Sequence, residues 1–140
     1  MNWLISQTDD LATCHDLRRI VFIEEQNVSE AEEVDGRDGE ALHVLATVDG
    51  KALGCARILI TEGVAKIGRV CVLKQARGTG LGAAIIESCL DVARNQPGVT
   101  KAKLGAQTHA LAFYEKLGFT AFGPVYDDAG IPHRDMERTL

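Results

Sequence analysis

The chain has 140 residues, is 46% hydrophobic and 25% charged, and carries a formal net charge of −5 at pH 7. This length and balance are typical of one globular domain with one core, so we predict a single domain over residues 1–140. The negative charge argues against a nucleic-acid partner, and no apolar run approaches the roughly 20 residues that span a bilayer. The N-terminal residues lack a basic segment followed by an apolar one, so we expect no signal peptide and a cytoplasmic location.

The first half of the chain predicts a strand, a helix, an acidic loop and three further strands. Residues 3–5 are typical of a short strand, after which Thr8 is expected to cap a helix over residues 9–26. Residues 27–40 are expected to form the loop. The turns Asp49-Gly50 and Glu62-Gly63 separate three apolar strands, which cover residues 41–48, 52–60 and 64–73.

The second half of the chain alternates helices and strands. A helix over residues 80–95 follows a glycine-rich loop, and a second helix over residues 108–119 is ended by Gly118. The strands cover residues 101–105, 119–123 and 134–139. The order β-α-β-β-β-α-β-α-β-β predicts a mixed α/β sheet in which an antiparallel meander precedes a strand–loop–helix unit.

The charges are unevenly distributed along the chain. Eight acids fall within residues 24–40: Glu24, Glu25, Glu30, Glu32, Glu33, Asp35, Asp38 and Glu40. The charged residues of segment 66–77 are all basic: Lys66, Arg69, Lys74 and Arg77. This division predicts one region that suits a cation and another that suits an anion, unless both are only solvated surface.

Four cysteines are widely separated within apolar stretches: Cys14, Cys55, Cys71 and Cys89. They form no C-x-x-C pair, as zinc sites and redox motifs require. We therefore expect reduced thiols in the core and no metal site.

The stretch "KQARGTGLGAAIIE" (residues 74–87) predicts an anion site. Gly78, Gly80 and Gly82 alternate directly before an apolar helix. The first N–H groups of a helix lack internal partners, the helix dipole is positive at this end, and glycine lets the backbone approach a phosphate. Arg77 is placed to add a charge-assisted contact.

Two familiar phosphate motifs fit this loop poorly. A Walker A loop needs a lysine and a hydroxyl at its end, where this chain has Gly80-Leu81-Gly82-Ala83. A dinucleotide fingerprint matches in letters, as Gly78-x-Gly80-x-x-Ala83. Its acid about 20 residues further on is missing from residues 100–106, and the strand before the loop belongs to an antiparallel meander.

The residues Gln75-Ala76-Arg77-Gly78-Thr79-Gly80 resemble the Q/R-x-x-G-x-G/A loop of the GNAT acetyltransferase superfamily, which binds the pyrophosphate of acetyl-CoA. The segment "ALAFYEKLGFTAFG" (residues 110–123) resembles the second conserved segment of that family, A-x-x-F-Y-x-x-x-G-F. The segments "RRIVFIEEQ" (18–26) and "GIPHRDM" (130–136), with Asp35-x-x-Asp38 and His43, resemble the ElaA/YjcF-like branch. The resemblance covers nearly the whole chain.

This resemblance implies a GNAT fold, with a central mixed, mostly antiparallel sheet flanked by helices. It implies an N-acetyltransferase that uses acetyl-CoA as co-substrate and transfers the acetyl group directly, in a ternary complex, to a small-molecule amine. We expect a monomer or homodimer. The residues expected to hold acetyl-CoA are Val72, Gln75, Arg77, Gly78, Thr79, Gly80 and Gly82.

Three catalytic roles follow from the resemblance. The backbone N–H of Val72 is expected to stabilise the oxyanion. Tyr114 holds the position of the general acid for the leaving thiolate, the alternative being an aromatic side chain that only packs on a helix face. The candidates for the base that deprotonates the amine are Glu25, His43, Glu24 and His133. We favour Glu25, and we expect the neighbouring acids to attract a cationic amine.

Rival functions are still open at this point. A non-catalytic acyl-CoA-binding or sensing module would keep the glycine loop but would need neither Tyr114 nor a base. Arg18 and Phe22, with Asp35 and Asp38, are also similar to the N-terminal region of acyl-homoserine-lactone synthases, a related fold. Nucleotide binding is a third possibility.

Overall fold

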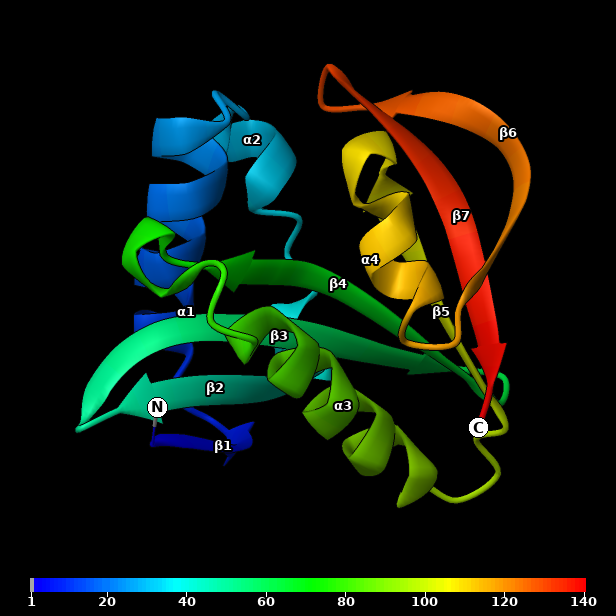
Figure 1. The fold of residues 1–140 in the computed structure, drawn as a ribbon, viewed down its shortest axis with the longest axis horizontal. Coiled ribbons are helices and arrows are strands. Elements are labelled where there is room, and N and C mark those ends of the chain that lie inside the picture. Colours follow the sequence, from blue (N-terminus) through cyan, green and yellow to red (C-terminus); the bar gives the residue numbers. More distant parts are fainter. Residues whose placement is uncertain (1) are drawn as a thin grey trace.

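In the computed structural model, which describes residues 2–140, a seven-stranded sheet runs through the molecule (Figure 1). The strands are β1 (Trp3–Thr8), β2 (Leu42–Val48), β3 (Lys51–Thr61), β4 (Val64–Val72), β5 (Lys101–Gln107), β6 (Thr120–Asp128) and β7 (Ile131–Thr139). Their order in the sheet is β1-β2-β3-β4-β5-β7-β6. Among the strands of residues 2–140, only β4 and β5 pair in parallel. The predicted mixed, mostly antiparallel sheet is confirmed.

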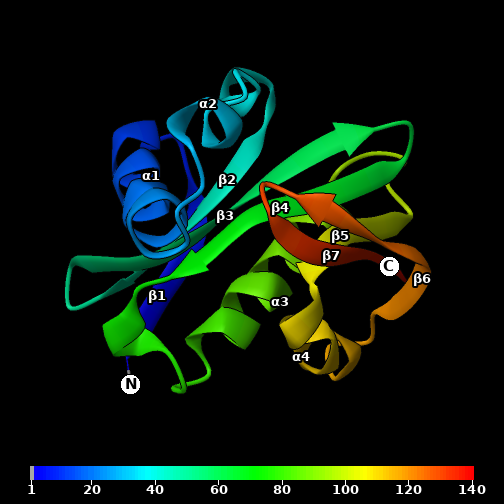
Figure 2. The ribbon, with the colours of Figure 1, turned by 90° about the horizontal axis from the view of Figure 1, so that it is seen from above.

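Helices cover both faces of this sheet (Figure 2). The helical elements are α1 (Leu11–Arg18), the π-helical segment η1 (Arg19–Glu25), α2 (Glu30–Glu33), η2 (Asp38–Glu40), η3 (Lys74–Ala76), α3 (Leu81–Arg94), η4 (Thr108–Ala110) and α4 (Leu111–Glu115). Helices α1 and α2 lie on one face, and α3 and α4 lie on the other. Within residues 2–140, no helix has the length and apolar character needed to cross a membrane.

Strand β3, inside the sheet, is buried on both faces, because α1 packs on one side and α3 on the other. A Cβ at Gly54 would lie 2.7 Å from Ile85 Cδ1 and 2.9 Å from Cys71 O, so only glycine lets α3 pack this closely. The next residue, Cys55, points to the opposite face, where its Sγ lies 3.8 Å from Cys14 O of α1. All four cysteines are buried and unbridged, as predicted.

The first helix differs from its prediction in its start and in its form. Thr8 is not its N-cap, because Thr8 still pairs with β2 as the last residue of β1. Asp10 caps α1 instead, with Oδ1 accepting from the N–H of Thr13 at 3.2 Å. From Arg19 the helix widens to π geometry.

Two segments are more ordered than the sequence indicated. The expected loop over residues 27–40 contains α2, which Ser29 caps, and η2. Strands β6 and β7 extend well beyond residues 119–123 and 134–139 and meet at a tight turn. Pro124 obscured this hairpin, since proline is unexpected inside a strand. The register shift between Phe122 and Tyr126 accommodates it.

Candidate active site

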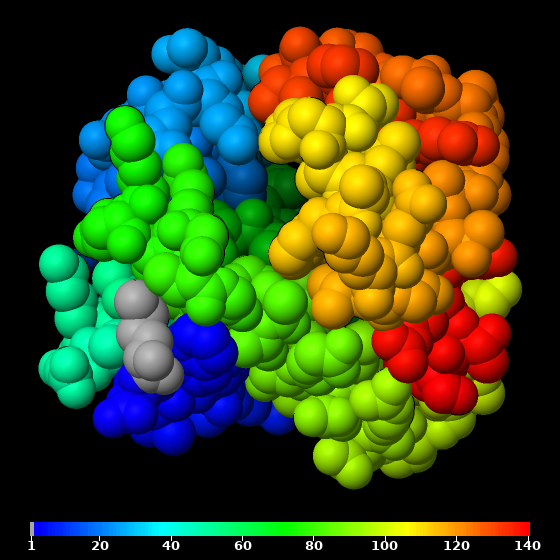
Figure 3. Space-filling view, in the orientation of Figure 1, coloured from blue at the N-terminus to red at the C-terminus, as the bar shows by residue number. Residues whose placement is uncertain are grey.

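A cleft opens where the parallel strands β4 and β5 separate. They pair only at Val64, Ala65 and Lys66 of β4, beyond which β4 continues without β5 beside it. The resulting cavity has a volume of about 680 Å³. Figure 3 shows it as a hollow between the N-terminal helices in blue, α4 in yellow and the loop after β4 in bright green. The divergence of this one strand pair therefore creates the site.

A β-bulge in β4 lies at the floor of the cleft. The pairing of β3 with β4 shifts between Cys55 and Arg57, so Arg69 and Val70 together face the single residue Ala56. Arg69 has a φ of +50°, in the left-handed region that non-glycine residues avoid, at a cost of about 1–3 kcal/mol. A bulge bends its strand, and we attribute the divergence of β4 from β5 to it.

The backbone N–H of Val72 points into the cleft. The next residue, Leu73, donates its N–H to Leu53 O of β3 at 2.8 Å. Successive N–H groups of an extended strand face opposite edges, so that of Val72 faces the edge from which β5 has diverged. This is the direction that the predicted oxyanion role of Val72 requires.

The loop after β4 leaves the N-terminus of α3 open to an anion. Gly78 and Gly80 have φ values of +76° and +91°, which favour glycine. Gly80 is the N-cap of α3 and has no side chain to bind the first N–H groups of the helix, although that of Leu81 makes a long contact of 3.4 Å with Thr79 Oγ1. A Cβ at Gly78 would meet no atom within 4 Å. The loop therefore fits a pyrophosphate such as that of acetyl-CoA.

Gly82 connects this loop with the cleft. A Cβ at Gly82 would lie 3.5 Å from Phe113 Cζ and 3.8 Å from Val72 Cγ2, so its absence keeps space open between α3, β4 and α4. Thr79 stabilises the loop itself, since its hydroxyl donates to Ala76 O at 2.6 Å. Gln75 is exposed on η3.

Arg77 folds back from the loop across the end of β4. Its Nε donates to Val72 O at 3.0 Å, and its Nη2 forms an ion pair with Glu25 Oε2 at 2.7 Å. Arg77 lines the cleft, whereas Glu25, the last residue of η1, does not. The structure thus joins the predicted base to a predicted phosphate ligand at the rim of the cleft.

Tyr114 on α4 lines the cleft from the side opposite α1. Its ring makes edge contacts with Phe113 and Phe119, at centroid distances of 5.0 and 6.0 Å. Burial, and to a smaller degree the nearby Cys89 thiol, raises the pKa of Tyr114 to about 12. The phenol therefore stays protonated near neutral pH and can donate a hydrogen bond. The packing role and the donor role are compatible.

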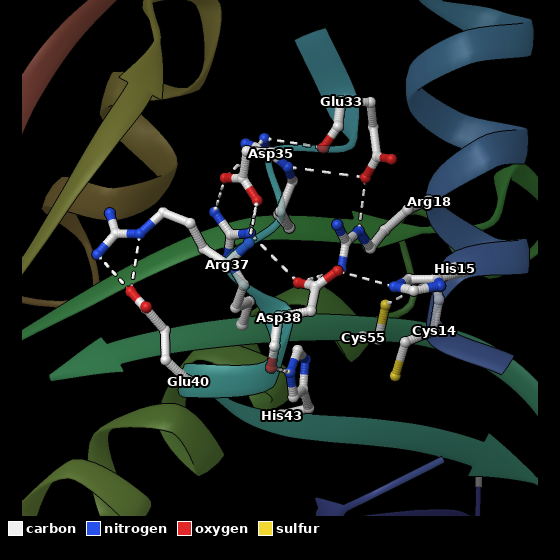
Figure 4. Close-up of polar contacts among 12 residues, drawn as sticks. Cys14, His15, Arg18, Glu33, Asp35, Arg37, Asp38, Glu40, His43 and Cys55 are labelled. Atoms are coloured by element: carbon white, nitrogen blue, oxygen red, sulfur yellow. Dashed lines mark hydrogen bonds and ion pairs between the residues drawn. The ribbon is translucent and has the colours of Figure 1, made fainter. Parts of the chain in front are cut away.

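A buried ion-pair network forms the N-terminal wall of the cleft (Figure 4). Arg18 is 1% exposed and binds Glu33 through Nε at 2.6 Å and Asp38 through Nη1 at 2.9 Å. Arg57 binds both carboxylate oxygens of Asp35 at 2.8 Å and reaches Asp38 Oδ1 at 3.2 Å. These contacts fix α1, α2 and η2 against β3.

Two carboxylates of this network, Asp35 and Asp38, are held in their charged form. Hydrogen bonds from Arg57 lower the pKa of Asp35 to about 2. Burial alone would raise the pKa of Asp38, but hydrogen bonds from Arg18 and His15 outweigh it and lower the pKa. Three arginines therefore face three carboxylates, since Arg69 also contacts Asp35 and the backbone of Glu33.

Six of the eight acids in residues 24–40 take part in ion pairs. The pairs are Glu24–Arg19, Glu25–Arg77, Glu33–Arg18, Asp35–Arg57, Asp38–Arg18 and Glu40–Arg37. The expectation that the whole stretch attracts a cation therefore needs correction. Among residues 2–140, Glu30 and Glu32 remain outside these pairs, and of the two only Glu32 lines the cleft.

The comparisons with known proteins identify the family. A family model described as "Acetyltransferase (GNAT) domain" matches residues 12–140. The chain is 38% identical over 121 residues to YjcF of Bacillus subtilis (strain 168), which is named as an uncharacterized N-acetyltransferase. The aligned region covers 86% of each protein. It is 34% identical over 129 residues to ElaA of Escherichia coli (strain K12), or 89% of this chain and 84% of ElaA. The chain belongs to the GNAT acetyltransferase family.

A solved structure agrees with this assignment. The crystal structure of an acyl-CoA N-acyltransferase from Pseudomonas aeruginosa superposes with a TM-score of 0.84 at 36% identity, over 99% of both chains. The resemblance found in the sequence, including that to the ElaA/YjcF-like branch, is confirmed, and the GNAT protein is an acyltransferase.

The GNAT cleft brings together part of the predicted site. Val72, Arg77, Gly82 and Tyr114 line it. The other loop residues lie next to it on the surface: Gln75, Gly78, Thr79 and Gly80.

The remaining base candidates lie in different surroundings. His43 is buried, with its Nε2 3.0 Å from Asp38 O, and so is a hydrogen-bonded core histidine. Glu24 pairs with Arg19 outside the cleft. His133 lines the cleft.

Sequence reasoning missed several residues of the GNAT cleft. Gln107 Nε2 donates to Gln26 Oε1 at 3.1 Å and so bridges β5 and the end of η1. Tyr126 lines the cleft from β6. The one available signal was Gly105, because a glycine inside a strand often marks the close approach of another group. The phenol of Tyr126 lies where a Cβ of Gly105 would be.

Proposed function

We propose that this GNAT protein is an acetyl-CoA-dependent N-acetyltransferase that transfers the acetyl group directly to a small cationic amine in a ternary complex. The observation that carries the proposal is the proximity of two kinds of backbone donor. The N–H of Val72 faces the cleft, and Gly82, in the first turn of α3, lies beside Val72. The first donor suits an oxyanion and the second a pyrophosphate. The names of YjcF and of the Pseudomonas aeruginosa enzyme support N-acyl transfer from an acyl-CoA.

Seven residues are proposed to hold the co-substrate: Val72, Gln75, Arg77, Gly78, Thr79, Gly80 and Gly82. When bound, acetyl-CoA supplies a thioester carbonyl as the electrophile. Gly78 and Gly80 keep backbone N–H groups accessible to phosphate oxygens, and Arg77 adds a positive charge once it leaves Glu25. Gly82 leaves room for the chain that leads to Val72.

Tyr114 is proposed to stabilise the leaving thiolate. Its pKa of about 12 lies well above that of a thiol, near 8.5, so complete proton transfer to the thiolate is uphill by roughly 5 kcal/mol. A hydrogen bond from the phenol instead strengthens as negative charge develops on the sulfur. Direct transfer also leaves no role for a cysteine nucleophile, and Cys71 Sγ lies against Cys55 Sγ at 3.5 Å.

We propose a cationic acceptor on the basis of two carboxylates in the cleft, and not of all eight acids of residues 24–40. Glu32 on α2 and Asp128 at the end of β6 line the cleft from different elements. Neither takes part in an ion pair within the part of the chain that the structure describes. An ammonium between them is favoured electrostatically.

The experiment that tests this function has two stages. Thermal unfolding is measured with acetyl-CoA, CoA, NAD and ATP, and we expect stabilisation by the first two only, because only they combine a pyrophosphate with a pantetheine arm that can enter the cleft past Gly82. CoA release from acetyl-CoA is then followed across cationic, neutral and anionic amines. Turnover with a cationic amine supports the proposal. Binding of acetyl-CoA without turnover of any amine would identify a binding or sensing module instead.

A further inference from the structure

His133 lies on the C-terminal wall of the cleft, which the β6–β7 hairpin forms. On β7 it pairs with Gln107 of β5 on one side and with Tyr126 of β6 on the other. All three residues line the cavity, as does Tyr114. An imidazole therefore faces the same space as the proposed donor of the leaving group.

The hydrogen bonding of His133 fixes its tautomer. Nδ1 lies 2.7 Å from the carbonyl oxygen of Ile131. A carbonyl oxygen can only accept, so Nδ1 carries the hydrogen. In the neutral ring Nε2 then holds a free lone pair, on the side of the ring away from this backbone contact.

Tyr126 holds the His133 ring in place. The two rings stack at 25° with centroids 5.9 Å apart. The phenol of Tyr126 donates to Asp135 Oδ1 at 2.7 Å, and Gly105 leaves room for it across β5. Burial and this carboxylate raise the pKa of Tyr126, so it stays neutral beside the imidazole. The orientation of His133 is therefore built into the hairpin and β5.

Among the other basic groups of the cleft, Glu32 and Asp128 are proposed above to bind the ammonium, and the rest are less suited to accept a proton. Glu33 and Asp35 are engaged by arginines. His109 donates through Nε2 to Gln107 Oε1 at 2.7 Å, which leaves Nδ1 as its acceptor, but His109 is exposed, whereas His133 is half-buried and stacked on Tyr126. Glu25 lies outside the lining and binds Arg77. The ionisable groups around His133 are Tyr126 and Asp128 on β6, His109 after β5, and Arg134 and Asp135 on its own strand.

We propose that His133 is the catalytic base, with Nε2 accepting the proton that the acceptor ammonium must lose before it attacks. This inference rests on the proposed N-acetyltransferase function. The neutral amine nitrogen then bonds to the thioester carbonyl carbon, and the carbonyl electron pair moves to the oxygen near Val72 N–H. Collapse of the tetrahedral intermediate breaks the C–S bond, and the bonding electron pair leaves with the sulfur. The second proton of the amine nitrogen is transferred to the departing thiolate, which becomes the CoA thiol. His133 returns its proton to water, so ammonium and acetyl-CoA give amide, CoA thiol and one proton.

His133→Asn tests the proposal, because the Asn amide can still donate to Ile131 O but has no titratable nitrogen. We expect kcat for a cationic alkylamine to fall about 100-fold or more, as for loss of a general base. The acid limb of the kcat/KM profile should disappear, since that limb reports the base of the free enzyme. The deficit should shrink for an amine that is already neutral at the assay pH, which a purely structural defect would not produce.

Matched variants make the outcomes distinct. His109→Asn alters the other histidine of the cleft and should retain the acid limb, and Glu25→Gln should retain it as well. Thermal stabilisation by acetyl-CoA should be the same in His133→Asn and wild type. An acid limb that survives in His133→Asn, or is lost in Glu25→Gln instead, overturns the assignment to His133 while leaving the proposed function intact. A wild-type protein that acetylates no amine overturns both.

Discussion

The two walls of the cleft use charged and polar residues in opposite ways. On the N-terminal wall, Arg18, Arg57 and Arg69 form ion pairs with Glu33, Asp35 and Asp38. On the other side, the first turn of α3, the N–H of Val72 and Nε2 of His133 face open space. Groups that bind one another shape and rigidify a site, whereas groups left unsatisfied at its surface are available to a ligand.

The wall with more charged side chains is not the wall with more groups available to a ligand. The N-terminal wall holds most of the acids that the sequence suggested for substrate binding, yet the arginines paired with them neutralise their charge. The other side has few charges, and its main donors are backbone N–H groups that composition does not reveal. Breaking either side should therefore give a different defect, of stability on one side and of binding or turnover on the other.

The largest expected effect is on folding, from Arg18→Ala. This change removes a partner from the buried Glu33 and the half-buried Asp38, and breaking a buried ion pair in this way costs about 3–5 kcal/mol. The free energy of unfolding, measured by urea denaturation, should fall by that amount. The matched control is Arg19→Ala, whose exposed pairs with Asp16 and Glu24 should be worth less than about 1 kcal/mol. Equal losses in both variants would show that the network contributes no more than surface charge.

Gly80→Asp should nearly abolish binding of acetyl-CoA while the protein stays folded. The carboxylate would repel the pyrophosphate and compete for the first N–H groups of α3. Losing about two charge-assisted hydrogen bonds, at roughly 2 kcal/mol each, corresponds to a roughly 1000-fold weaker Kd. Calorimetric titration with acetyl-CoA measures the change.

Gly50→Asp is the matched control for this substitution, because Gly50 also has positive φ, at +80°, but lies in the β2–β3 turn. Both variants should lose similar stability, since both strain the left-handed region. Only the change at Gly80 should affect the Kd. If both variants bind acetyl-CoA like wild type, the phosphate lies elsewhere.

Tyr114→Phe keeps the packing against Phe113 and Phe119 and removes only the hydroxyl. We expect kcat to fall by about 100-fold, with the Kd of acetyl-CoA unchanged. Burial raises the pKa of Tyr114 to about 12, so the phenol stays protonated between pH 8 and 10. Any loss of wild-type turnover within this pH range should therefore also occur in Tyr114→Phe. Unchanged turnover in Tyr114→Phe, with chemistry rate-limiting, would leave this tyrosine with packing as its only role.

Much of the fold and the glycine-rich loop before α3 could be predicted from the sequence. Glycines at positive φ, strand alternation and the turn residues at positions 49–50 and 62–63 are local signals that tertiary structure seldom overrides. The acids were misjudged because some of their partners are distant in the sequence: Arg57 and Arg69, which contact Asp35, lie on strands more than 20 residues further along the chain. The roles of Tyr126 and His133 depend on a hairpin that crosses β5, and pairing of this kind leaves no trace in a local pattern.

The smallest expected effect distinguishes the two acids that remain outside the ion pairs. Glu32→Gln should raise KM for a cationic amine by about two- to fivefold at low salt, which is the effect of losing one exposed charge pair. The difference in KM should shrink at high salt, because salt already screens charges over about 8 Å at physiological ionic strength. Glu30→Gln is the matched control, since it removes the same charge from α2 outside the cleft lining. Glu33 is left intact, because it neutralises the buried Arg18. The measurement is steady-state kinetics at two salt concentrations. Equal KM values for both variants would mean that only the net charge of the protein matters. A higher KM in Glu32→Gln alone would place the ammonium against α2.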